Sequence, residues 1–281
     1  MKSALAILLA AAAVPQASAE ADLAMDAPWT ASLGKSDASK LHINVLERRH
    51  GMLGMSVPIA DFTGLSAAEL EGTGKPVMFV LRRESGTVTF TGRFAKGTGQ
   101  GTLHYAPDPA YFARLQAMGV RNDLAQERTN VLALPLLDLR SDYVAALRRE
   151  GAFADLSDYV GMRALNAKPE VVHELRALIG APIKASNVLS LTALGVTPDY
   201  VREMGRAFPG VGARDLTSLK ALGVSADYIG TMRAAGARIQ SASDAQSFRA
   251  LGISPAAVKR TIAHGKLHPS ASDVMETSMR F

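Results

Sequence analysis

The chain has 281 residues, of which 48% are hydrophobic and 20% charged, and it contains no cysteine. Disulfide bonds, thiol catalysis and lipid attachment to a cysteine are therefore excluded. The fold must be stabilised by its hydrophobic core alone, which a chain of this length can form. The formal net charge is +5, and the excess lies in residues 109–281. Spread over that length, it is a weak field that permits nucleic-acid binding without predicting it.

The first residues have the pattern of a secretory signal peptide. Lys2 precedes an apolar run from Ala4 to Val14, and Ala17-Ser18-Ala19 has the small-x-small pattern of a cleavage site. The apolar run is too short for a membrane helix, which needs about 20 residues. We therefore expect residues 1–19 to be removed on export. The remaining chain, from Glu20, is expected to be periplasmic or secreted, with no membrane span.

Residues 28–108 show the alternation of apolar and polar residues that is typical of β-strands. Val88, Phe90 and Phe94 lie on one side of the clearest stretch. Five to seven antiparallel strands are expected, closing into a β-sandwich or a partly open barrel. The glycines at 97, 99 and 101 are interpreted as a hairpin turn with a bulge, because a phosphate-binding loop needs a helix after it.

Residues 129–265 contain five copies of a unit of 28–29 residues. The stretch 194–201 (LGVTPDYV) recurs as 222–229 (LGVSADYI) and as 251–258 (LGISPAAV), and the frame continues back to 165–172 and 137–144. Repeats of this length are typical of stacked helical units. The expected architecture is α+β, a β-domain followed by an all-α tandem helix-turn-helix array. Residues 109–128 are expected to form a connecting helix and residues 266–281 a loose tail.

Each unit reads as two short helices joined by a tight turn. Glycine is expected at the C′ position of the first helix, and Thr or Ser at the N-cap of the second. The apolar residues at helical spacing, tyrosines and methionines included, are interpreted as core, because helices of about ten residues are unstable alone. The last copy, with Ala257 and Thr261, is expected to cap the stack. The predicted cap residues are Gly195, Gly223, Gly252, Thr197, Ser225 and Ser254.

No pattern nominates a catalytic, cofactor-binding or metal-binding residue. The sequence from His173 begins like HExxH but lacks the second histidine. His264 and His268 are four residues apart, but Gly265 and Pro269 argue against a shared helical face. The remaining histidines do not have zinc-ligand spacing, and a G-x-S-x-G nucleophile motif is absent.

Two stretches carry a resemblance to known proteins. The first runs from Phe90 to Pro107 (FTGRFAKGTGQGTLHYAP), and the second is the repeated Leu-Gly-Val-Thr/Ser-x-Asp-Tyr-Val/Ile. Together they resemble an exported bacterial module of unknown function. They are also similar to the extracytoplasmic tails of some antirepressor-type membrane zinc metallopeptidases of the beta-lactam-sensor kind. The resemblance covers residues 28–265 and implies sensing or interaction in the periplasm. The peptidase's HExxH motif and membrane helices are absent from this sequence, so its activity is not implied.

The hairpins also resemble helix-hairpin-helix DNA-binding motifs, which occur in exported DNA-uptake receptors. Those motifs have a second glycine, which lets backbone N–H groups reach phosphate. This chain has Thr or Ser at that position. We therefore expect a non-catalytic module that binds a protein partner in the cell envelope, with DNA binding as the alternative. The candidate surface for DNA or a partner comprises Arg202, Arg206, Arg233, Lys259 and Arg260.

Overall fold

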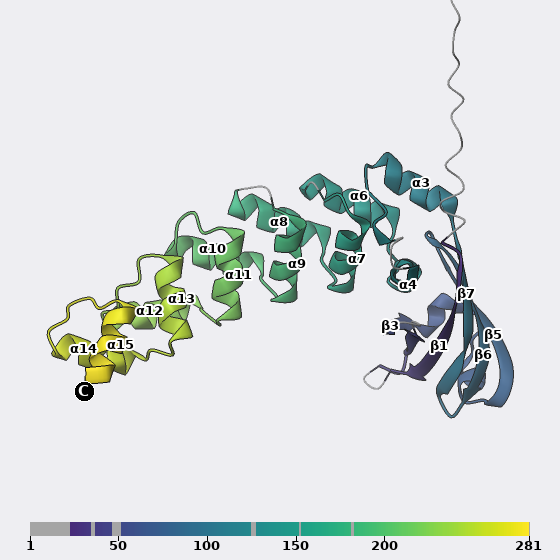
Figure 1. Ribbon diagram of the computed structural model, residues 1–281, viewed down its shortest axis with the longest axis horizontal. Helices are drawn as coiled ribbons and strands as arrows, with labels where there is room; N and C mark the ends of the chain where they lie inside the picture. Colours follow the sequence, from purple (N-terminus) through teal and green to yellow (C-terminus); the bar gives the residue numbers. More distant parts are fainter. Residues whose placement is uncertain are drawn as a thin grey trace, which may run out of the picture. The chain divides into compact units, whose positions relative to one another are not determined.

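A computed structural model describes residues 23–34, 37–46, 52–124, 128–151, 153–180 and 183–280. The chain divides into two compact units, unit 1 with Met1–Ala117 and Leu124–Asp138, and unit 2 with Met118–Asp123 and Leu139–Phe281. Unit 1 is β-rich and unit 2 is helical, which confirms the expected α+β class (Figure 1). In the described part of the chain, no helix is long and apolar enough to cross a membrane. The predicted signal peptide, residues 1–19, lies outside the described residues.

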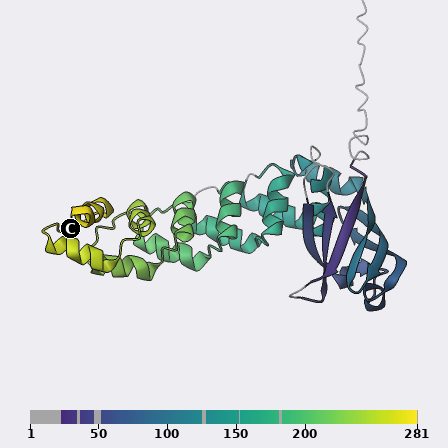
Figure 2. The same ribbon diagram turned by 60° about the horizontal axis from the view of Figure 1, so that its bottom comes forward.

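Unit 1 is built on one antiparallel sheet of seven strands, in the order β3-β2-β1-β7-β6-β5-β4. The two edge strands, β3 and β4, are separated in sequence only by the 3-10 helix η1, so the sheet must curl until its edges approach each other. The result is a half-barrel, which is the partly open barrel of the two predicted alternatives (Figure 2). The elements are β1 Met25–Leu33, β2 Lys40–Leu46, β3 Met52–Pro58, η1 Ile59–Asp61, β4 Phe62–Thr63, α2 Ala67–Leu70, β5 Thr73–Arg83, β6 Gly86–Ala95 and β7 Thr98–Pro107.

A cluster of aromatic rings fills the inside of the half-barrel. Phe79 and Phe90 stack with their ring centroids 4.7 Å apart. Trp29 meets both rings edge-on, at 5.5 and 5.8 Å, and Phe62 and Phe94 complete the cluster. Trp29, Phe79, Phe90 and Phe94 are at most 1% exposed. The period-2 pattern of the sequence therefore identifies the core face of the strands correctly.

The glycine cluster after β6 forms a hairpin. Ala95 pairs with Thr98, and the two residues between them, Lys96 and Gly97, have φ values of 51° and 75°. Two consecutive residues with positive φ make the type I′ turn that suits the twist of a two-residue hairpin. Strands flank this turn on both sides, so the hairpin is confirmed, whereas the predicted bulge is wrong, because β6 and β7 pair from Gly86 to Ala95 without a shift of register.

Two helical segments complete unit 1. Helix α3 (Pro109–Ala117) buries Tyr111, Phe112 and Leu115. After α4 (Arg128–Val131), helix α5 (Ala133–Leu136) is buried along its whole length and packs against β3, β5 and β6. The repeat pattern placed residues 131–137 in the first repeat, whereas the structure places α5 on the half-barrel. The apolar spacing predicts a buried helix face but not the surface that buries it.

Residues 118–123 belong to the helical unit. The N–H of Arg121 donates to the carbonyl of Ala154 at 2.7 Å, and the N–H of Leu156 donates to the carbonyl of Arg121 at 2.9 Å. The Asp123 carboxylate accepts a hydrogen bond from the N–H of Ser157 at 3.0 Å. The connecting helix expected over residues 109–128 therefore ends at Ala117, and a turn at residues 118–119 follows it.

Unit 2 is an array of paired helices in two layers. Helices α6, α8, α10, α12 and α14 form one layer, and α7, α9, α11, α13 and α15 form the other. Most helices pack against the next helix of their own layer, and α14 also packs against α15 (Figure 1). The bounds are α6 Ser141–Glu150, α7 Leu156–Ala164, α8 Pro169–Ile179, α9 Ala185–Ala193, α10 Pro198–Ala207, α11 Ala213–Ala221, α12 Ala226–Ala234, α13 Ala242–Ala250, α14 Pro255–Ala263 and α15 Ala271–Arg280.

Most of the apolar positions that recur in the repeats are buried in the array. One example is the position six residues after the glycine, where all five residues are buried. The leucine that precedes the glycine behaves differently, because Leu165 and Leu251 are 40% and 50% exposed. This leucine is the C-cap, and the apolar contact of such a cap is made by the residue after the glycine instead. The five buried residues are Val144, Val172, Val201, Ile229 and Val258.

The predicted loose tail is wrong for residues 271–280, which form helix α15. Ala271 and Val274 are buried, and the helix packs against α13 and α14. The last copy of the motif is consequently followed by another helix and does not end the stack. A sequence signal for this exists, since Ser-Ala-Ser-Asp occurs at 241–244 and again at 270–273. In both places Ser and Asp form a reciprocal N-terminal cap, with the serine N–H donating to the Asp carboxylate at 2.9 Å.

Candidate functional site

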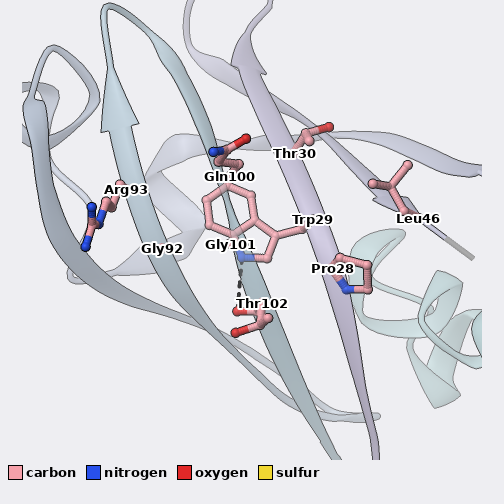
Figure 3. A pocket seen from close by; sticks show the side chains of 9 residues that line it. All are labelled: Pro28, Trp29, Thr30, Leu46, Gly92, Arg93, Gln100, Gly101 and Thr102. Carbon is pink, nitrogen blue, oxygen red and sulfur yellow. Dashed lines mark hydrogen bonds between the residues drawn. The ribbon is translucent and has the colours of Figure 1, made fainter.

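The half-barrel has a shallow hollow over strands β1, β7 and β6, with a volume of about 550 Å³. Its floor consists of Trp29, Gly92 and Gly101, which are consecutive partners across the three strands (Figure 3). A Cβ atom on Gly92 would lie 2.7 Å from the Trp29 ring, and one on Gly101 would lie 2.0 Å from a backbone oxygen of the neighbouring strand. Both positions therefore require glycine, and the Trp29 ring occupies the place where a Gly92 side chain would lie.

The rim of the hollow combines polar and apolar side chains. Arg93 and Gln100 face each other across β6 and β7, and both are exposed. The Trp29 indole N–H donates to the Thr102 carbonyl at 3.0 Å and is therefore satisfied within the fold (Figure 3). The arrangement offers a guanidinium, an amide and hydroxyls, which can form hydrogen bonds with a polar group. The other rim residues are Pro28, Thr30 and Leu46.

An ionic cluster closes unit 1 where α5 meets the sheet. Arg83 of β5 contacts Asp61 of η1 at 2.5 Å and Asp138 at 3.5 Å. Its Nε also donates to the Pro135 carbonyl of α5 at 3.4 Å. The Arg83 side chain is only 14% exposed. This cluster fastens α5 to the sheet, and its role is structural.

In unit 2 the predicted cap residues build the turn between the two helices of a repeat. Gly195, Gly223 and Gly252 have φ values of 63°, 68° and 64°. The N–H groups of the glycine and of the next residue bond to the end of the first helix, as in a Schellman motif. The same position is occupied by Asp138 and Asn166 in the earlier copies, with φ values of 51° and 55°. Asp and Asn tolerate this conformation, which explains why the frame persists without glycine.

The predicted N-cap residues occupy the starts of the second helices. The Thr197 hydroxyl accepts a hydrogen bond from the N–H of Tyr200 at 3.3 Å, and the equivalent bonds to Ser225 and Ser254 are 3.1 and 3.2 Å. In α10 the first residue is Pro198, which has no N–H. The start of this helix is therefore largely saturated within the chain.

We predict that Thr197→Ala lowers the free energy of unfolding of unit 2 by about 1 kcal/mol, because one N–H at the start of α10 loses its acceptor. Urea unfolding followed by tyrosine fluorescence measures this change. Thr231→Ala on α12 is the control, since it removes an exposed hydroxyl that caps no helix. An equal or smaller loss for Thr197→Ala than for the control would contradict the assignment of the cap.

Tyrosines join successive repeats in a way that sequence reasoning missed. The hydroxyl of Tyr200 donates to the carbonyl of Val224 in the next repeat at 2.9 Å, and that of Tyr143 donates to Ala167 at 2.8 Å. Burial raises the pKa of both Tyr200 and Tyr143 to about 12, so both hydroxyls keep their protons at neutral pH. The stripe of tyrosines is thus part of the packing between repeats.

The rings of three tyrosines also make cation–π contacts, each with a Lys or Arg of the following repeat. Arg163 lies over Tyr143 at 5.6 Å, Lys220 over Tyr200 at 4.7 Å and Arg249 over Tyr228 at 5.0 Å. The cation always stands three residues before the glycine position of its own repeat. Where the tyrosine is replaced by Val171, the following repeat has Thr192 at that place. This covariation between neighbouring repeats is the signal that would have revealed the pairs.

The five cations of the predicted surface do not act as one group. Arg202 forms ion pairs with Glu174 and, at 2.6 Å, with Asp199. Arg233 donates from Nε to the Ile239 carbonyl at 3.0 Å and lies over the Phe208 ring at 5.4 Å. Arg202 and Arg233 therefore hold the array together. The three remaining residues, Arg206, Lys259 and Arg260, are exposed on α10 and α14.

Three of the described histidines lie apart, each beside its own partner. His104 is 2.8 Å from Asp26 in unit 1, and His173 is 3.0 Å from Glu150 in unit 2. His42 is 3.1 Å from the Ser56 hydroxyl. Within the described ranges, His, Asp and Glu do not gather into a group of three or more that could hold a metal ion.

Comparison with known proteins does not assign the chain to a family. The chain matches no protein-family model, no curated protein and no solved structure. What the protein does must therefore be inferred from its own residues and their geometry.

Proposed function

We propose that this protein is an exported, non-catalytic module that binds a protein partner in the cell envelope, with the helical array as the main binding surface. Stacked helical repeats present extended surfaces suited to this role. The resemblance of the sequence to the tails of sensor-type peptidases points in the same direction. The hollow on the half-barrel is a second place where a partner's polar group would fit.

One observation carries the proposal, which is the contrast between buried and outward positions of the second helices. The position six residues after the glycine is buried and holds Val or Ile in every copy. The residue that follows it differs in chemical type from copy to copy. A ligand with a regular charge spacing, such as a nucleic-acid backbone, favours the same cation in each repeat. An irregular surface favours an irregular partner, and proteins are irregular. The five outward residues are Ala145, His173, Arg202, Gly230 and Lys259.

The N-termini of the second helices are also poorly suited to binding the phosphate groups of a nucleic acid. Phosphate binds well at a helix N-terminus only when N–H groups are free and no negative charge is present. In α6, α8, α10 and α12 the second helical residue is acidic. In α10 and α12 the N–H of the third helical residue already donates to the hydroxyl of the N-cap residue. The acidic residues are Asp142, Glu170, Asp199 and Asp227.

Site-specific photo-crosslinking in cells tests the proposal. A photoreactive amino acid is placed at position 173, 202 or 230 of the second helices, with positions 214 and 243 of the first helices as matched exposed controls. We expect one protein species to be crosslinked from more than one second helix and much less from the first helices. Absence of a protein adduct from all of these positions, or adducts with nucleic acid instead, would overturn the proposal.

The export part of the proposal has its own test. Protein recovered from the periplasm or the medium is expected to begin at Glu20, because cleavage after Ala17-Ser18-Ala19 removes the apolar segment. N-terminal sequencing reads this directly. A full-length chain that retains Met1 and fractionates with the cytoplasm would show that residues 1–19 are not a cleaved signal.

Binding to duplex DNA is expected to be weak and non-specific. With two of the five candidate cations used inside the array, we predict a dissociation constant no tighter than about 10⁻⁴–10⁻⁶ M at physiological salt. Fluorescence anisotropy of a labelled duplex, measured across a salt titration with the chain from Glu20 onward, checks this value. Nanomolar binding at roughly 0.15 M salt would make DNA the better assignment.

A further inference from the structure

The second helix of the last repeat, α14, differs in charge from the second helices before it. From Ala245 to Ser272 the chain carries no acidic residue, and this is the longest such stretch after Glu20. Helices α6, α8, α10 and α12 each contain an acidic residue, whereas α14 contains Lys259 and Arg260 and none. Both side chains are exposed, and within the described ranges neither forms an ion pair. Positive charge therefore collects at the C-terminal end of the array.

The loop after α14 presents an apolar residue beside these cations. Leu267 is 79% exposed. The preceding loop, after α12, has the same length, and there Ala237 and Ile239 are buried while Arg238 between them is exposed. In the last loop the apolar Leu267 stands at the exposed position that corresponds to Arg238, so an apolar residue replaces a charged one there. The loop thus exposes a leucine at a position that the core does not use.

This loop is held in place on both sides of the leucine. The N–H of Lys266 donates to the carbonyl of Thr261 at 3.3 Å, which folds the loop back beside the last turn of α14 and its cations. The carbonyl of Pro269 accepts from the N–H of Arg238 at 3.0 Å. The Lys266 ammonium also contacts Asp273 at 3.1 Å. Because the loop is already ordered, contact with a surface costs little further conformational entropy.

We propose that this end of the array, defined by Lys259, Arg260 and Leu267, rests on the surface of an anionic lipid bilayer. Cations attract the anionic headgroups, and the leucine inserts between them. An exposed leucine adds nothing to an electrostatic contact with nucleic acid, so its presence beside the cations favours lipid. The lipid surface shares Lys259 with the outward positions of the second helices, but the inference is drawn from the charge of α14 and the exposed leucine of the last loop and does not depend on the proposed function.

Binding to vesicles tests the proposal with the chain from Glu20 onward, because the apolar segment before it would bind lipid by itself. Sedimentation is compared between phosphatidylcholine vesicles with and without phosphatidylglycerol. Binding is expected only to the anionic vesicles and at millimolar lipid, since a Lys or Arg near the surface contributes about 1 kcal/mol, or roughly fivefold. Equal binding to both vesicle types, or no binding to either, would overturn the proposal.

Two variants separate the cations from the leucine. Lys259→Glu with Arg260→Glu is expected to weaken binding about 25-fold or more. Arg206→Glu with Arg214→Glu makes the same change in net charge at exposed positions elsewhere and is expected to weaken it far less. Equal losses would show that only net charge matters and would contradict a defined surface. A larger effect of the first pair on DNA binding than on vesicle binding would assign the surface to nucleic acid instead.

Leu267→Trp reports insertion directly. The chain has one tryptophan, Trp29, which is 1% exposed in the core of unit 1, so a second indole at 267 adds a separate, solvent-exposed signal. Its emission is expected to shift to the blue on anionic vesicles and to be quenched by brominated lipids. Leu267→Ala is expected to weaken binding about tenfold through lost apolar contact. Vesicle binding without any shift of the indole emission would exclude insertion of the loop.

Discussion

Leu219→Ala is expected to lower the free energy of unfolding of the helical array by about 2–5 kcal/mol. Leu219 is fully buried on α11, and this helix packs against its neighbours in the same layer, α9 and α13. Truncation removes apolar contacts on both sides and leaves a cavity. The short helices can close this cavity only if whole repeats move. Leu191→Ala on α9, which is also fully buried, is expected to fall in the same range.

Leu251→Ala is the matched control for these two variants. It removes the same atoms from the same array, but Leu251 is 50% exposed, so its effect is expected to stay within about 0.5–1 kcal/mol. Four of the six tyrosines lie in the array, and the single tryptophan reports on unit 1. If urea unfolding shows no difference between Leu219→Ala and Leu251→Ala, the inward register of the repeats is wrong.

Trp29→Ala is expected to destabilise unit 1 by about 3–5 kcal/mol. The ring contacts Phe79, Phe90 and Phe94 and covers the backbone at Gly92. Its loss opens a cavity in the middle of the aromatic cluster, and it also leaves the Thr102 carbonyl without its indole donor. An aromatic ring that shields a strand glycine in this way contributes to the stability of the sheet beyond its own burial.

Near-UV circular dichroism during urea unfolding measures the effect, since the variant has no tryptophan fluorescence. Met78→Ala on β5 is the control, because Met78 is 64% exposed on the same sheet, and a change within about 0.5 kcal/mol is expected. A loss below about 1 kcal/mol for Trp29→Ala would mean that the aromatic cluster does not form the core of the half-barrel.

Local conformation in this protein follows from the sequence because it depends on neighbours along the chain. Alternating residues set the inward face of the strands, and Gly195, Gly223 and Gly252 set the turns through their positive φ values. Even Asp138 and Asn166 can be placed by register, since they adopt the same backbone conformation. These features need only steric preferences and hydrogen bonds within a few residues.

Long-range partners follow from the tertiary structure, because an apolar face does not specify what covers it. The sequence left open whether the strands form a sandwich or a partly open barrel, and the short link through η1 between the edge strands decided for the barrel. Leu134 is buried in α5, which packs on the half-barrel, although its spacing matched the repeats.

The candidate sites depend on the fold in the same way. The rings of Tyr143 and Tyr200 meet Arg163 and Lys220 only once the repeats have stacked. Sequence alone thus determined the inward face of the strands, the repeat frame and the caps, whereas helix α15 was missed. The tertiary structure decided which faces meet, because packing joins residues that are distant in sequence and fit several partners equally well by pattern alone.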